Sequence, residues 1–339
     1  MRVVIVGGGM AGLLCAKALR RRGVEPAVLE RMPAGTEVPG VIMLPWQAYD
    51  ACRDVGAYDE IRSRGWDVAP TEQGPTAIAV TRQAILDALG RDVDVRHDQE
   101  ILDLVRDGDR VAGVRVRGPE GERVEPADLV VGADGAASRV RQLAGIDCEL
   151  RPSEAAGLSF RSPVVPQQPF AMTYQSDGRQ VGLLGWPGGS AGWWQIDRMG
   201  RDAALAPGLD EFKRCYARLL PAGKASVDAL TSIDQVTYRE VTEVVCDAWW
   251  RPGVVLIGEA AHSIDPESGV GAGLALGDAH ALAVAIARSD GPDAACASYE
   301  TWRRPFVEPY LAIGAQGSRI VFGTPGADRP PVERWPPVT

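Results

Sequence analysis

Paired cysteines, long hydrophobic runs and an excess of positive charge are all missing from this sequence of 339 residues. Its six cysteines lie far apart without a C-x-x-C pair, which excludes the usual structural zinc motif and fits reduced thiols in a cytoplasm. No apolar run approaches the roughly 20 residues of a membrane-spanning helix. The net charge of -9 argues against non-specific binding to nucleic acid or anionic membranes. We therefore expect a cytoplasmic protein without a metal site.

The apolar N-terminus is predicted to be a folded element and not a signal peptide, because its basic cluster at residues 20–22 follows the apolar stretch. Residues 3–6 are continuously apolar, as in a parallel strand that is buried on both faces. From Met10 onward the apolar residues recur at helical spacing. Residues 26–30 then form a second predicted strand, which completes a βαβ unit.

The turn between this first strand and the helix has the pattern G-x-G-x-x-G, with its glycines at Gly7, Gly9 and Gly12. Gly7 permits a tight turn, Gly9 lets a pyrophosphate approach the backbone, and Gly12 allows the helix to pack closely on the strand. The helix N-terminus, at Met10 and Ala11, supplies N–H groups and the positive end of its dipole to an anion.

The second strand ends at Glu30, and Arg31 follows it. A carboxylate at this place accepts hydrogen bonds from a ribose, and we include its neighbour Arg31 in the predicted site. Strand, glycine turn, helix and acid in this order predict a dinucleotide-binding site. The motif alone does not distinguish NAD from FAD.

Later segments divide into parallel and antiparallel strands. Apolar strands at residues 129–131 and 254–257 each run into a glycine-containing turn and extend the parallel sheet. Residues 93–127 have the alternation and the D-G-D turn of an antiparallel meander. Residues 151–245 carry further antiparallel strands separated by glycine turns, which predicts a second sheet inserted between the last two parallel strands.

This order predicts an α/β fold in which a Rossmann-like cofactor domain, made of a parallel sheet and an antiparallel meander, carries an inserted substrate domain. We place the cofactor domain at residues 1–150 and 246–290. The inserted domain, a mainly antiparallel β-sheet, covers residues 151–245. Residues 291–339 then form C-terminal helices and a proline-rich tail that starts at Gly323.

Two further motifs resemble those of a known family. Residues 128–141 read D-L-V-V-G-A-D-G-A-A-S-R-V-R, and residues 258–279 read G-E-A-A-H-S-I-D-P-E-S-G-V-G-A-G-L-A-L-G-D-A. They resemble the DG and GD motifs of the FAD-dependent aromatic hydroxylases, the class A flavoprotein monooxygenases that share the fold of para-hydroxybenzoate hydroxylase. With Arg82 in its T-R-x-x-L segment, the resemblance spans roughly residues 1–290.

The resemblance implies that the cofactor is FAD and that Arg82 belongs to its site. It places Asp134 and Gly135 near the pyrophosphate and the flavin linker, and it gives residue 259 the ribityl or ribose hydroxyls. The family usually has aspartate where this chain has Glu259, so the carboxylate is kept but its reach is longer. The residues alone leave another role open for Asp134, which is to cap the next helix.

The loop from Pro266 onward is implied to line the isoalloxazine ring. Its predicted contacts come from Gly269, Gly271, Ala272 and Gly273. A glycine-rich loop that opens a helix presents N–H groups, and an anionic reduced flavin develops charge at its N1–C2 carbonyl edge. The predicted flavin site and the physical chemistry of the loop therefore agree.

Asp265 and Pro266 are our candidates for catalysis. Asp265 and Glu267 flank Pro266 beside the expected flavin face, where either carboxylate is suited to deprotonating a phenolic substrate. The alternative is that these carboxylates lie in a solvated loop. We interpret His262, in its G-x-A-A-H context, as a structural residue and not as the base.

Tryptophan is frequent, with nine residues. Alternation along the predicted sheet places Trp193 and Trp194 on opposite faces, so that one is free to stack on an aromatic substrate while the other packs in the core. We assign substrate contacts to Trp186, Trp194 and Arg179. A surface position is the open alternative for Arg179.

The resemblance implies a single-component monooxygenase. NADPH or NADH would reduce FAD, O2 would form a flavin C4a-hydroperoxide, and its terminal oxygen would hydroxylate or epoxidise an aromatic or polycyclic small molecule. Three alternatives stay open: a flavin-dependent dehydrogenase or reductase, a non-redox isomerase or cyclase that retains FAD, and a binding protein without turnover. The Ala-, Arg- and Gly-rich composition suggests natural-product biosynthesis in a GC-rich bacterium. The oligomeric state is open.

Overall fold

The computed structural model describes residues 1–71 and 74–313, and the predicted proline-rich tail from Gly323 lies outside them. A parallel sheet, three antiparallel sheets or ribbons and the helices between them confirm the predicted α/β class. In the described part of the chain, no helix combines the length and the apolarity that crossing a bilayer requires.

The chain divides into two compact units. Unit 1 contains Met1–Ala34, Asp92–Leu150 and the described residues from Glu243 to Ile313. Unit 2 contains Gly35–Arg91 and Arg151–Thr242. Each unit is assembled from segments that are distant in the sequence, because the chain leaves unit 1 after Ala34 and again after Leu150.

Unit 1 is built on a sheet of six strands in the order β16-β17-β10-β1-β2-β6. The strands are β1 (Val3–Val6), β2 (Pro26–Leu29), β6 (Val95–Arg96), β10 (Leu129–Gly132), β16 (Trp250–Arg251) and β17 (Val254–Leu256). They pair in parallel, except that β16 is antiparallel to β17. Every residue of β1 and β10 is buried, which explains their continuous apolar sequences.

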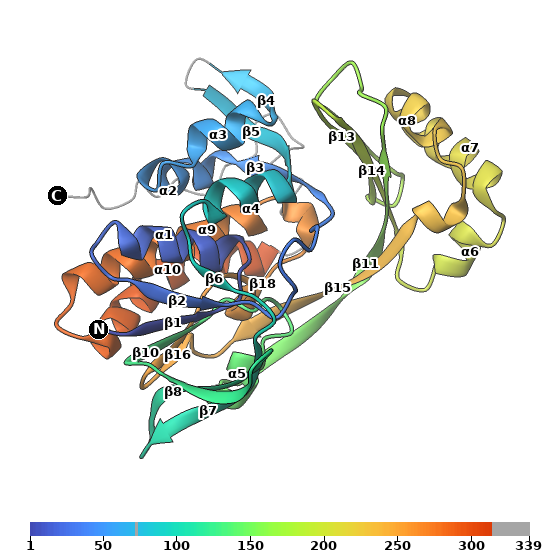
Figure 1. Ribbon diagram of the computed structural model, residues 1–339. Helices are drawn as coiled ribbons and strands as arrows, with labels where there is room; N and C mark the ends of the chain where they lie inside the picture. The colour runs from blue at the N-terminus through green and yellow to red at the C-terminus, as the bar shows by residue number, and fades with distance from the viewer. Residues whose placement is uncertain (72–73, 314–339) are drawn as a thin grey trace. The chain divides into compact units, whose positions relative to one another are not determined.

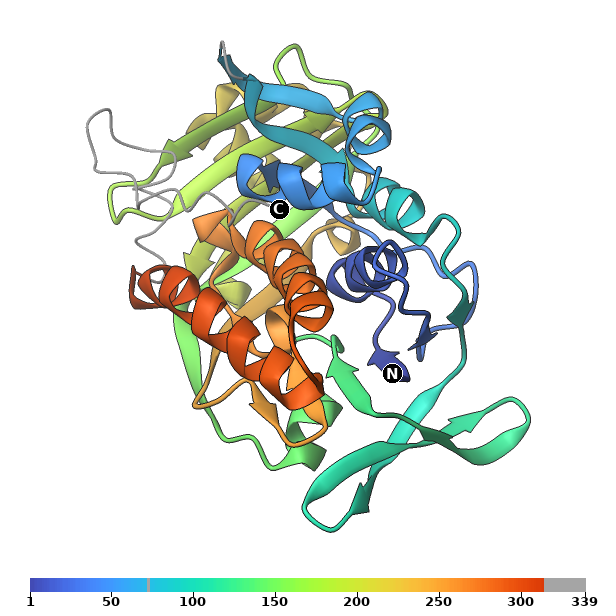
Figure 2. The ribbon, with the colours of Figure 1, turned by 90° about the vertical axis from the view of Figure 1, so that its left-hand side faces the viewer.

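Helices and a three-stranded meander cover the two faces of this sheet (Figures 1 and 2). The meander consists of β7 (Glu100–Asp107), β8 (Arg110–Gly118) and β9 (Gly121–Pro126), and β8 contacts β10. The helices are α1 (Met10–Arg20), α5 (Arg139–Ala144), α9 (Gly271–Arg288) and α10 (Pro292–Ile313). Helix α9 packs between α1 and α10 and is rich in alanine and leucine, which makes it helical and apolar all round.

Three short elements of unit 1 connect β17 to α9. They are the 3-10 turn η4 (Gly258–Ala260), the strand β18 (His262–Ser263) and the 3-10 turn η5 (Pro266–Ser268). Strand β18 pairs with the end of a long strand, β15 (Thr237–Cys246), that enters unit 1 from unit 2. This connection contains the residues of the GD motif.

Unit 2 holds two antiparallel sheets. The larger has the order β12-β13-β14-β11-β15, and its strands besides β15 are β11 (Cys148–Ser162), β12 (Phe170–Tyr174), β13 (Gln180–Trp186) and β14 (Gly189–Asp197). The smaller has the order β3-β5-β4, with β3 (Val41–Pro45), β4 (Trp66–Thr71) and β5 (Gly74–Thr81).

The helices of unit 2 fall into two groups. The first group accompanies the smaller sheet and comprises η1 (Trp46–Ala48), α2 (Tyr49–Asp54), α3 (Tyr58–Ser63) and α4 (Arg82–Gly90). The second group follows β14 and comprises α6 (Arg201–Leu205), α7 (Leu209–Leu219), η2 (Pro221–Gly223), α8 (Lys224–Asp228) and η3 (Ile233–Gln235).

The larger sheet of unit 2 has a different apolar cluster on each face. On the helix-covered face, Phe160 of β11 packs edge-on against Phe212 and Tyr216 of α7. On the other face, Trp193 packs with residues of β4, β5 and β13. The opposite orientation of neighbouring tryptophans follows from the pleat of the strand.

The observed division differs from the predicted one at residues 35–91. We placed this segment in the cofactor domain, whereas the structure groups it with residues 151–242. The physical reason is the contact of β3 and β5 with β13, which buries Ala77 and Ala79 together with Leu184. Strands β3 to β5 were not among the predicted elements, so the smaller sheet of unit 2 was not predicted.

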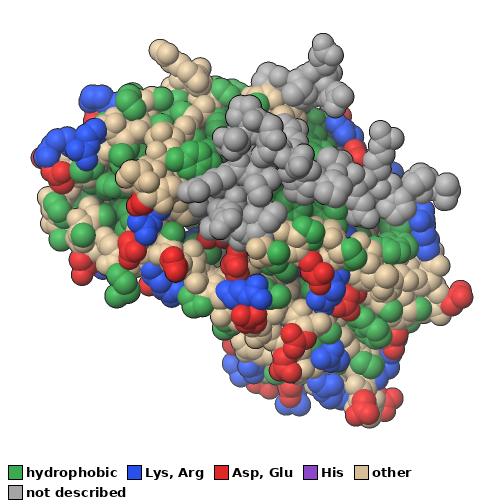
Figure 3. Space-filling view, turned by 180° about the vertical axis from the view of Figure 1, so that it is seen from behind, with side chains coloured by type: hydrophobic (Ala, Val, Ile, Leu, Met, Phe, Trp, Pro, Cys, Tyr) green, Lys and Arg blue, Asp and Glu red, His purple; other side chains and the backbone are tan. Residues whose placement is uncertain are grey.

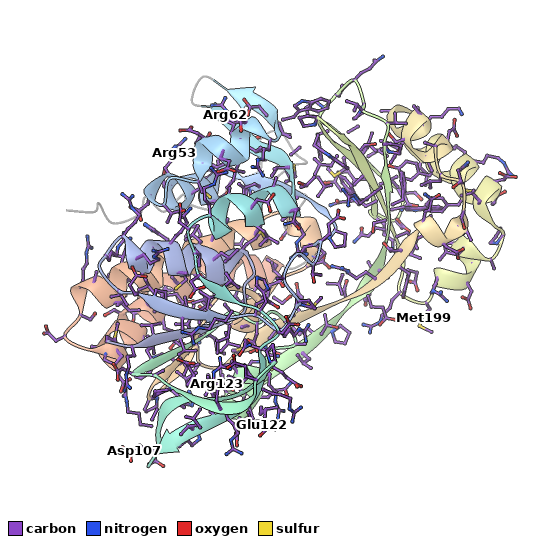
Figure 4. The ribbon with its side chains drawn as sticks, in the orientation of Figure 1. Arg53, Arg62, Asp107, Glu122, Arg123 and Met199 are labelled. Carbon is purple, nitrogen blue, oxygen red and sulfur yellow. The ribbon has the colours of Figure 1, made fainter. Side chains whose placement is uncertain are left out.

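Exposed charges in unit 2 have partners close to them in the sequence. Arg62 of α3 donates to both carboxylate oxygens of Asp67, over 3.1 and 2.7 Å, and Arg53 of α2 lies 4.3 Å from the ring centre of Tyr58 (Figure 4). Acidic and basic side chains are interspersed on the face that Figure 3 shows. Such exposed ion pairs contribute little to stability, because water screens them.

Candidate functional site

The glycine turn between β1 and α1 is tightly packed at two of its glycines and open at the third. Gly7 has a φ of +109°, and a Cβ there would lie 2.4 Å from the carbonyl oxygen of Ala133. A Cβ on Gly12 would lie 1.9 Å from the carbonyl oxygen of Gly7. A Cβ on Gly9 would meet no atom within 4 Å. The turn thus leaves room for a ligand at Gly9, where the motif predicts the pyrophosphate.

The N-terminus of α1 offers backbone donors that have no acceptor inside the helix. The first bond within the helix joins Leu13 N to Gly9 O over 2.9 Å, so the N–H groups of Met10, Ala11 and Gly12 have no acceptor inside the helix. Within the described residues no side chain caps Gly9, and the first turn contains no acid. These donors and the helix dipole favour an anion such as a diphosphate.

Glu30 lies beside this turn at the end of β2. Its Oε2 accepts a hydrogen bond from Gly8 N over 2.6 Å, and its Oε1 accepts one from Met32 N over 2.8 Å. The two bonds orient the carboxylate, and each oxygen keeps a lone pair for a further donor. Arg31 is exposed to solvent.

Asp134 caps α5, which is the alternative that the residues left open. Its Oδ1 accepts from Ser138 Oγ over 2.5 Å, and its Oδ2 accepts from Arg139 N and Val140 N over 2.7 and 3.1 Å. Gly135 follows with a φ of +81°, a conformation that suits glycine. The carboxylate therefore shapes the turn after β10 through its hydrogen bonds to α5.

The turn η4 brings Glu259 to the same region of unit 1. A Cβ on Gly135 would lie 4.0 Å from Glu259 Oε2. A Cβ on Gly258 would lie 3.0 Å from the Cβ of Ala275 and 3.4 Å from that of Ala11, so the turn packs between the second turn of α9 and the first turn of α1. Glu259 is exposed, and no ion pair or hydrogen bond engages its carboxylate in the described part of the chain.

Arg141 ties this turn to the turn after β10. Its Nη1 donates to Ala260 O over 2.9 Å, and its Nη2 donates to Ala136 O over 2.7 Å. The side chain is buried, with 4% of the residue exposed. A buried guanidinium that bonds two carbonyls fixes the distance between their turns.

Asp278 of α9 also binds the η4 turn, through the backbone of Gly258. Its Oδ2 accepts from Gly258 N over 2.9 Å and lies 2.6 Å from His262 Nε2, while its Oδ1 accepts from Arg303 Nε over 2.9 Å. Burial raises the pKa of this carboxyl, but the charges and hydrogen bonds of His262 and Arg303 outweigh burial and hold the pKa below its ordinary value. The buried position of His262 supports its interpretation as a structural residue.

The motifs contain Arg141 and Asp278 without marking their role. The available signal for Asp278 is a carboxylate inside an otherwise apolar helix, because a buried charge needs partners. No comparable signal exists for Arg141, whose partners are backbone carbonyls.

The N-terminus of α9 provides a second set of backbone donors that have no acceptor inside their helix. The first bond within this helix joins Leu274 N to Val270 O over 2.9 Å, which leaves the N–H groups of Gly271, Ala272 and Gly273 without an acceptor inside the helix. Within the described residues no side chain caps this end. The loop before it turns at Gly269, whose φ is +66°.

The candidate base Asp265 is buried, with 2% of the residue exposed, while Pro266 beside it is exposed. Asp265 N donates to Glu243 Oε1 over 3.3 Å, and Asp265 O accepts from Ser268 N over 3.0 Å. This burial contradicts the solvated-loop alternative for Asp265. Its role as a base, and that of Pro266 in catalysis, stay predictions.

Arg82 lies in unit 2 at the start of α4. Thr81 caps this helix by accepting from Ala84 N over 3.2 Å, and Arg82 N donates to Gly40 O over 3.0 Å. The Nε of Arg82 is buried and has no hydrogen-bond partner within the described residues. A buried donor without an acceptor is costly, so this N–H is available to a ligand or to a bound water.

The predicted substrate residues lie apart on the larger sheet of unit 2. Trp194 is on the helix-covered face, where its ring is 5.8 Å from that of Phe212 and its Nε1 donates to Gln175 Oε1 over 3.3 Å. Trp193 is on the opposite face and stacks on Phe170 at 6.2 Å. We expected one member of the pair to pack in the core, but both do: Trp194 packs against the cluster on the helix-covered face, and Trp193 packs against the cluster of β4, β5 and β13 on the other face.

Trp186 and Arg179 are also engaged within unit 2. Arg161 lies 5.5 Å from the ring centre of Trp186, which is 9% exposed. Arg179 donates to Asp177 over 2.6 Å and to Asp197 over 3.0 Å. Two carboxylates thus neutralise Arg179, which favours the surface position that we left open for it.

Comparison with known families identifies the class of protein. The model of the family described as "FAD binding domain" matches residues 1–312. The chain belongs to this family, and the site residues of unit 1 lie within the matched range. Its relatives and its fold place it among the FAD-dependent aromatic monooxygenases, the class A flavoprotein monooxygenases.

The chain is similar along most of its length to characterised proteins. It is 28% identical to the aurachin C monooxygenase/isomerase of Stigmatella aurantiaca, over 92% of this chain and 87% of that protein. It is 27% identical to the 6-methylpretetramide 4-monooxygenase of Streptomyces rimosus, over 95% of this chain and 84% of that protein. The fold matches that of PqsL from Pseudomonas aeruginosa in complex with 2-aminobenzoylacetate, with a TM-score of 0.82, 23% identity and coverage of 96% of this chain and 100% of PqsL.

Proposed function

We propose that this protein uses NADPH or NADH and O2 to hydroxylate or epoxidise an aromatic or polycyclic small molecule with bound FAD. The observation that carries the FAD site is the place of the η4 turn, where Gly258 packs between Ala11 of α1 and Ala275 of α9 and where, within the described residues, the exposed carboxylate of Glu259 has no partner. FAD has a diphosphate, two sets of hydroxyls and a ring that becomes anionic on reduction. Unit 1 offers a matching donor or acceptor for each of these groups.

Each part of FAD has candidate partners in unit 1. The open N-terminus of α1 at Gly9 would hold the diphosphate, and Glu30 would accept from the ribose hydroxyls through its remaining lone pairs. Glu259 would accept from hydroxyls of the ribityl or ribose, since its carboxylate has no partner in the described part of the chain. Asp134 would act through the turn that it caps, by placing Gly135.

The N-terminus of α9 would stabilise negative charge. The N–H groups of Gly271, Ala272 and Gly273 point along the helix dipole without an acceptor inside the helix. Negative charge at this N-terminus is stabilised by the N–H groups and by the helix dipole, and a reduced isoalloxazine carries such charge. FAD, when bound, would supply the redox chemistry by accepting hydride from the nicotinamide and by activating O2.

The substrate class rests on the relatives. The names of the two relatives describe monooxygenases, and one of them names 6-methylpretetramide and its 4-position. Arg82, with its unpartnered buried Nε in unit 2, is the candidate in that unit for a contact with FAD. Of the predicted substrate residues, we keep Trp186 in the proposal and replace Trp194 with Trp193, because Trp193 is on the face away from the helices.

One other activity has a specific observation in its favour. The Stigmatella relative is named a monooxygenase/isomerase, so a non-redox isomerisation on an FAD-bearing scaffold is our second candidate. The two candidates differ in oxygen use, because an isomerisation consumes neither O2 nor reduced nicotinamide.

The test is to purify the protein with FAD and follow NADPH and NADH oxidation together with O2 consumption, with and without a panel of phenols, quinolones and polycyclic aromatics. The proposal expects at least one compound to accelerate both and to gain an oxygen atom from isotopically labelled O2. Product formation without O2 uptake favours the isomerase. Failure of the purified chain to bind FAD at all overturns both.

A further inference from the structure

Two cysteines from distant parts of the chain oppose each other in unit 1. Cys148 begins β11 and Cys246 ends β15, and these strands are hydrogen-bonded neighbours. Just outside the strands, the backbone N–H of Asp247 donates to Asp147 O over 3.1 Å. Cys148 and Cys246 are therefore the next opposed pair of residues along the two strands, one position further into the sheet than this bond.

The ladder geometry sets the distance between the two cysteines. The strands run antiparallel, because the start of β11 meets the end of β15 here, while Ser159 near the other end of β11 bonds Thr237 at the start of β15. Directly opposed residues beside such a bond form a non-hydrogen-bonded pair, with Cα atoms about 4.5 Å apart and side chains on one face. A disulfide requires Cα atoms about 4.4–6.8 Å apart. The pair thus meets the requirement for a disulfide.

The two thiols differ in their surroundings. Cys148 is partly exposed, whereas Cys246 is 2% exposed and its Sγ donates to Ala260 O over 3.7 Å. Burial raises the pKa of Cys246 to about 12, and Cys148 is among the nearby groups that add to the rise. Cys148 is therefore the thiol that meets an oxidant first.

The acceptor of the Cys246 thiol is part of the cofactor site. Ala260 O belongs to η4, the turn that carries Glu259, and it accepts from Arg141 as well. A sulfur in a disulfide has no hydrogen to donate, so oxidation removes one of the two donors on this carbonyl. The state of the cysteine pair is thereby coupled to the position of Glu259.

We propose that Cys148 and Cys246 form a reversible disulfide on exposure to peroxide, and that this disulfide weakens FAD binding by loosening the η4 turn. The disulfide itself is independent of the proposed function, while its effect on FAD rests on FAD binding at Glu259.

The chemistry uses one hydrogen peroxide for each disulfide. The Cys148 thiolate attacks a peroxide oxygen, the O–O bond breaks, and the departing hydroxide takes a proton to become water, which leaves a sulfenic acid on Cys148. The Cys246 sulfur, as it loses its proton, attacks the Cys148 sulfur, the S–O bond breaks and a second water leaves. The two sulfurs together give two electrons to the peroxide.

The other four cysteines provide a contrast within the same molecule. Cys15, Cys52 and Cys296 are buried, and burial raises the pKa of each to about 12. Cys215 is partly exposed on α7, where its Sγ donates to Glu211 Oε1 over 3.1 Å. These four lie on separate helices, so the proposed chemistry belongs to the opposed pair.

The first experiment maps the disulfide in the FAD-loaded protein carrying Cys215→Ser, which removes the other partly exposed thiol. After mild hydrogen peroxide, non-reducing peptide mass spectrometry is expected to show the Cys148 and Cys246 peptides joined, with the loss of two hydrogens, and dithiothreitol is expected to separate them. Cys148→Ser in the same background is expected to give no joined peptide. Free thiols after peroxide, or a Cys148 oxidised without joining Cys246, would overturn the site.

The second experiment measures the FAD dissociation constant by flavin fluorescence before and after peroxide. We expect oxidation to raise the constant about threefold, as for the loss of one weak hydrogen bond, and dithiothreitol to restore it. The Cys148→Ser protein keeps the Cys246 thiol and is expected to show no change. An unchanged constant in a protein with the mapped disulfide overturns the coupling. A chain that binds no FAD fails the proposed function, while the disulfide map still decides the site.

Discussion

The two units position their side chains by different means. In unit 1, buried charged groups hold the turn that carries Glu259, with Arg141 on one side and Asp278 on the other. In unit 2, aromatic rings on both faces of the larger sheet hold Trp193 and Trp194. A buried polar network requires particular residues in one geometry, whereas an apolar core tolerates substitution by other apolar residues of similar total volume. The motifs are therefore easy to read in unit 1 and are hardly visible in unit 2.

The largest effect is expected from Asp278→Ala in unit 1. The substitution leaves Arg303 and His262 buried without their carboxylate, which costs about 3–5 kcal/mol of stability. Urea unfolding at neutral pH measures this loss, and FAD binding is expected to fall with it because Gly258 N loses its acceptor. Asp278→Asn, which keeps the shape and an acceptor oxygen, is the milder matched variant. An Asp278→Ala protein as stable as the parent would show that the hydrogen bonds of Asp278 do not stabilise the fold.

Acid is expected to weaken the same anchor. Because the folded-state pKa of Asp278 lies below its ordinary value of 3.8, its contribution to stability is complete above that value and is lost as the pH falls through the lowered pKa. Urea unfolding between neutral pH and pH below the ordinary value measures the loss. The Asp278→Asn protein is expected to lose less stability over this range, and equal losses in both proteins would assign the acid sensitivity to other carboxyls.

Tyr216→Phe tests the corresponding contact in unit 2. The Tyr216 hydroxyl donates to Gly182 O over 2.7 Å in a buried position, and its removal takes one hydrogen bond from that carbonyl at a cost of about 1 kcal/mol. The FAD dissociation constant is expected to stay unchanged, because the contact lies in the apolar core of unit 2. A loss of FAD affinity in this variant would remove the distinction between the two units.

Glu259→Gln separates binding from stability in unit 1. The carboxylate is exposed and has no partner in the described part of the chain, so the free energy of unfolding of the FAD-free protein is expected to change by less than about 0.5 kcal/mol. FAD affinity is expected to fall about tenfold, or about 1.4 kcal/mol, because an amide accepts hydroxyl donors less strongly. Glu259→Asp restores the charge with a shorter reach and is expected to recover part of the affinity. Unchanged affinity in Glu259→Gln would exclude a contact of this carboxylate with FAD.

The smallest effect is expected from Arg179→Ala in unit 2. Its ion pairs with Asp177 and Asp197 are largely exposed, so we expect a loss of stability below about 1 kcal/mol. Steady-state kinetics on the substrate found in the panel provide the second measurement. An unchanged KM supports the surface position, whereas a raised KM with unchanged kcat would return Arg179 to the substrate site.

The local sequence was sufficient to predict the helices and strands whose apolar residues recur at a regular spacing. The βαβ unit around Gly7–Gly12, the β7–β8 hairpin and helices α9 and α10 were all predicted, since each depends on the spacing of apolar residues or on a turn sequence. Strands β3 to β5 were not predicted. Their burial comes from contact with β13, a strand about a hundred residues later, and no local period records such a contact.

The site was predictable to the extent that backbone geometry demands particular residues. Gly7 and Gly12 are required by clashes of 2.4 and 1.9 Å that any Cβ would cause, and such glycines are visible in a motif. The cap made by Asp134 was foreseen only as an alternative, because the same residue type suits a cap and a cofactor contact. Trp194 shows the limit, since alternation separates the two faces of a strand without saying which face the helices cover.

The sequence by itself determined the class of this protein. Glycines at positions where a Cβ would clash, an apolar run that forms a buried parallel strand and the turns that open the helices each depend on residues close together in the sequence, so a motif reveals them. The tertiary structure alone decided which residues meet across the chain: Arg141 with Ala260, Asp278 with Gly258, and Cys148 with Cys246. In the first two pairs one partner is a backbone group, which any residue type provides. In the third, the register of two strands almost a hundred residues apart brings the cysteines together, and register is a property of the folded sheet.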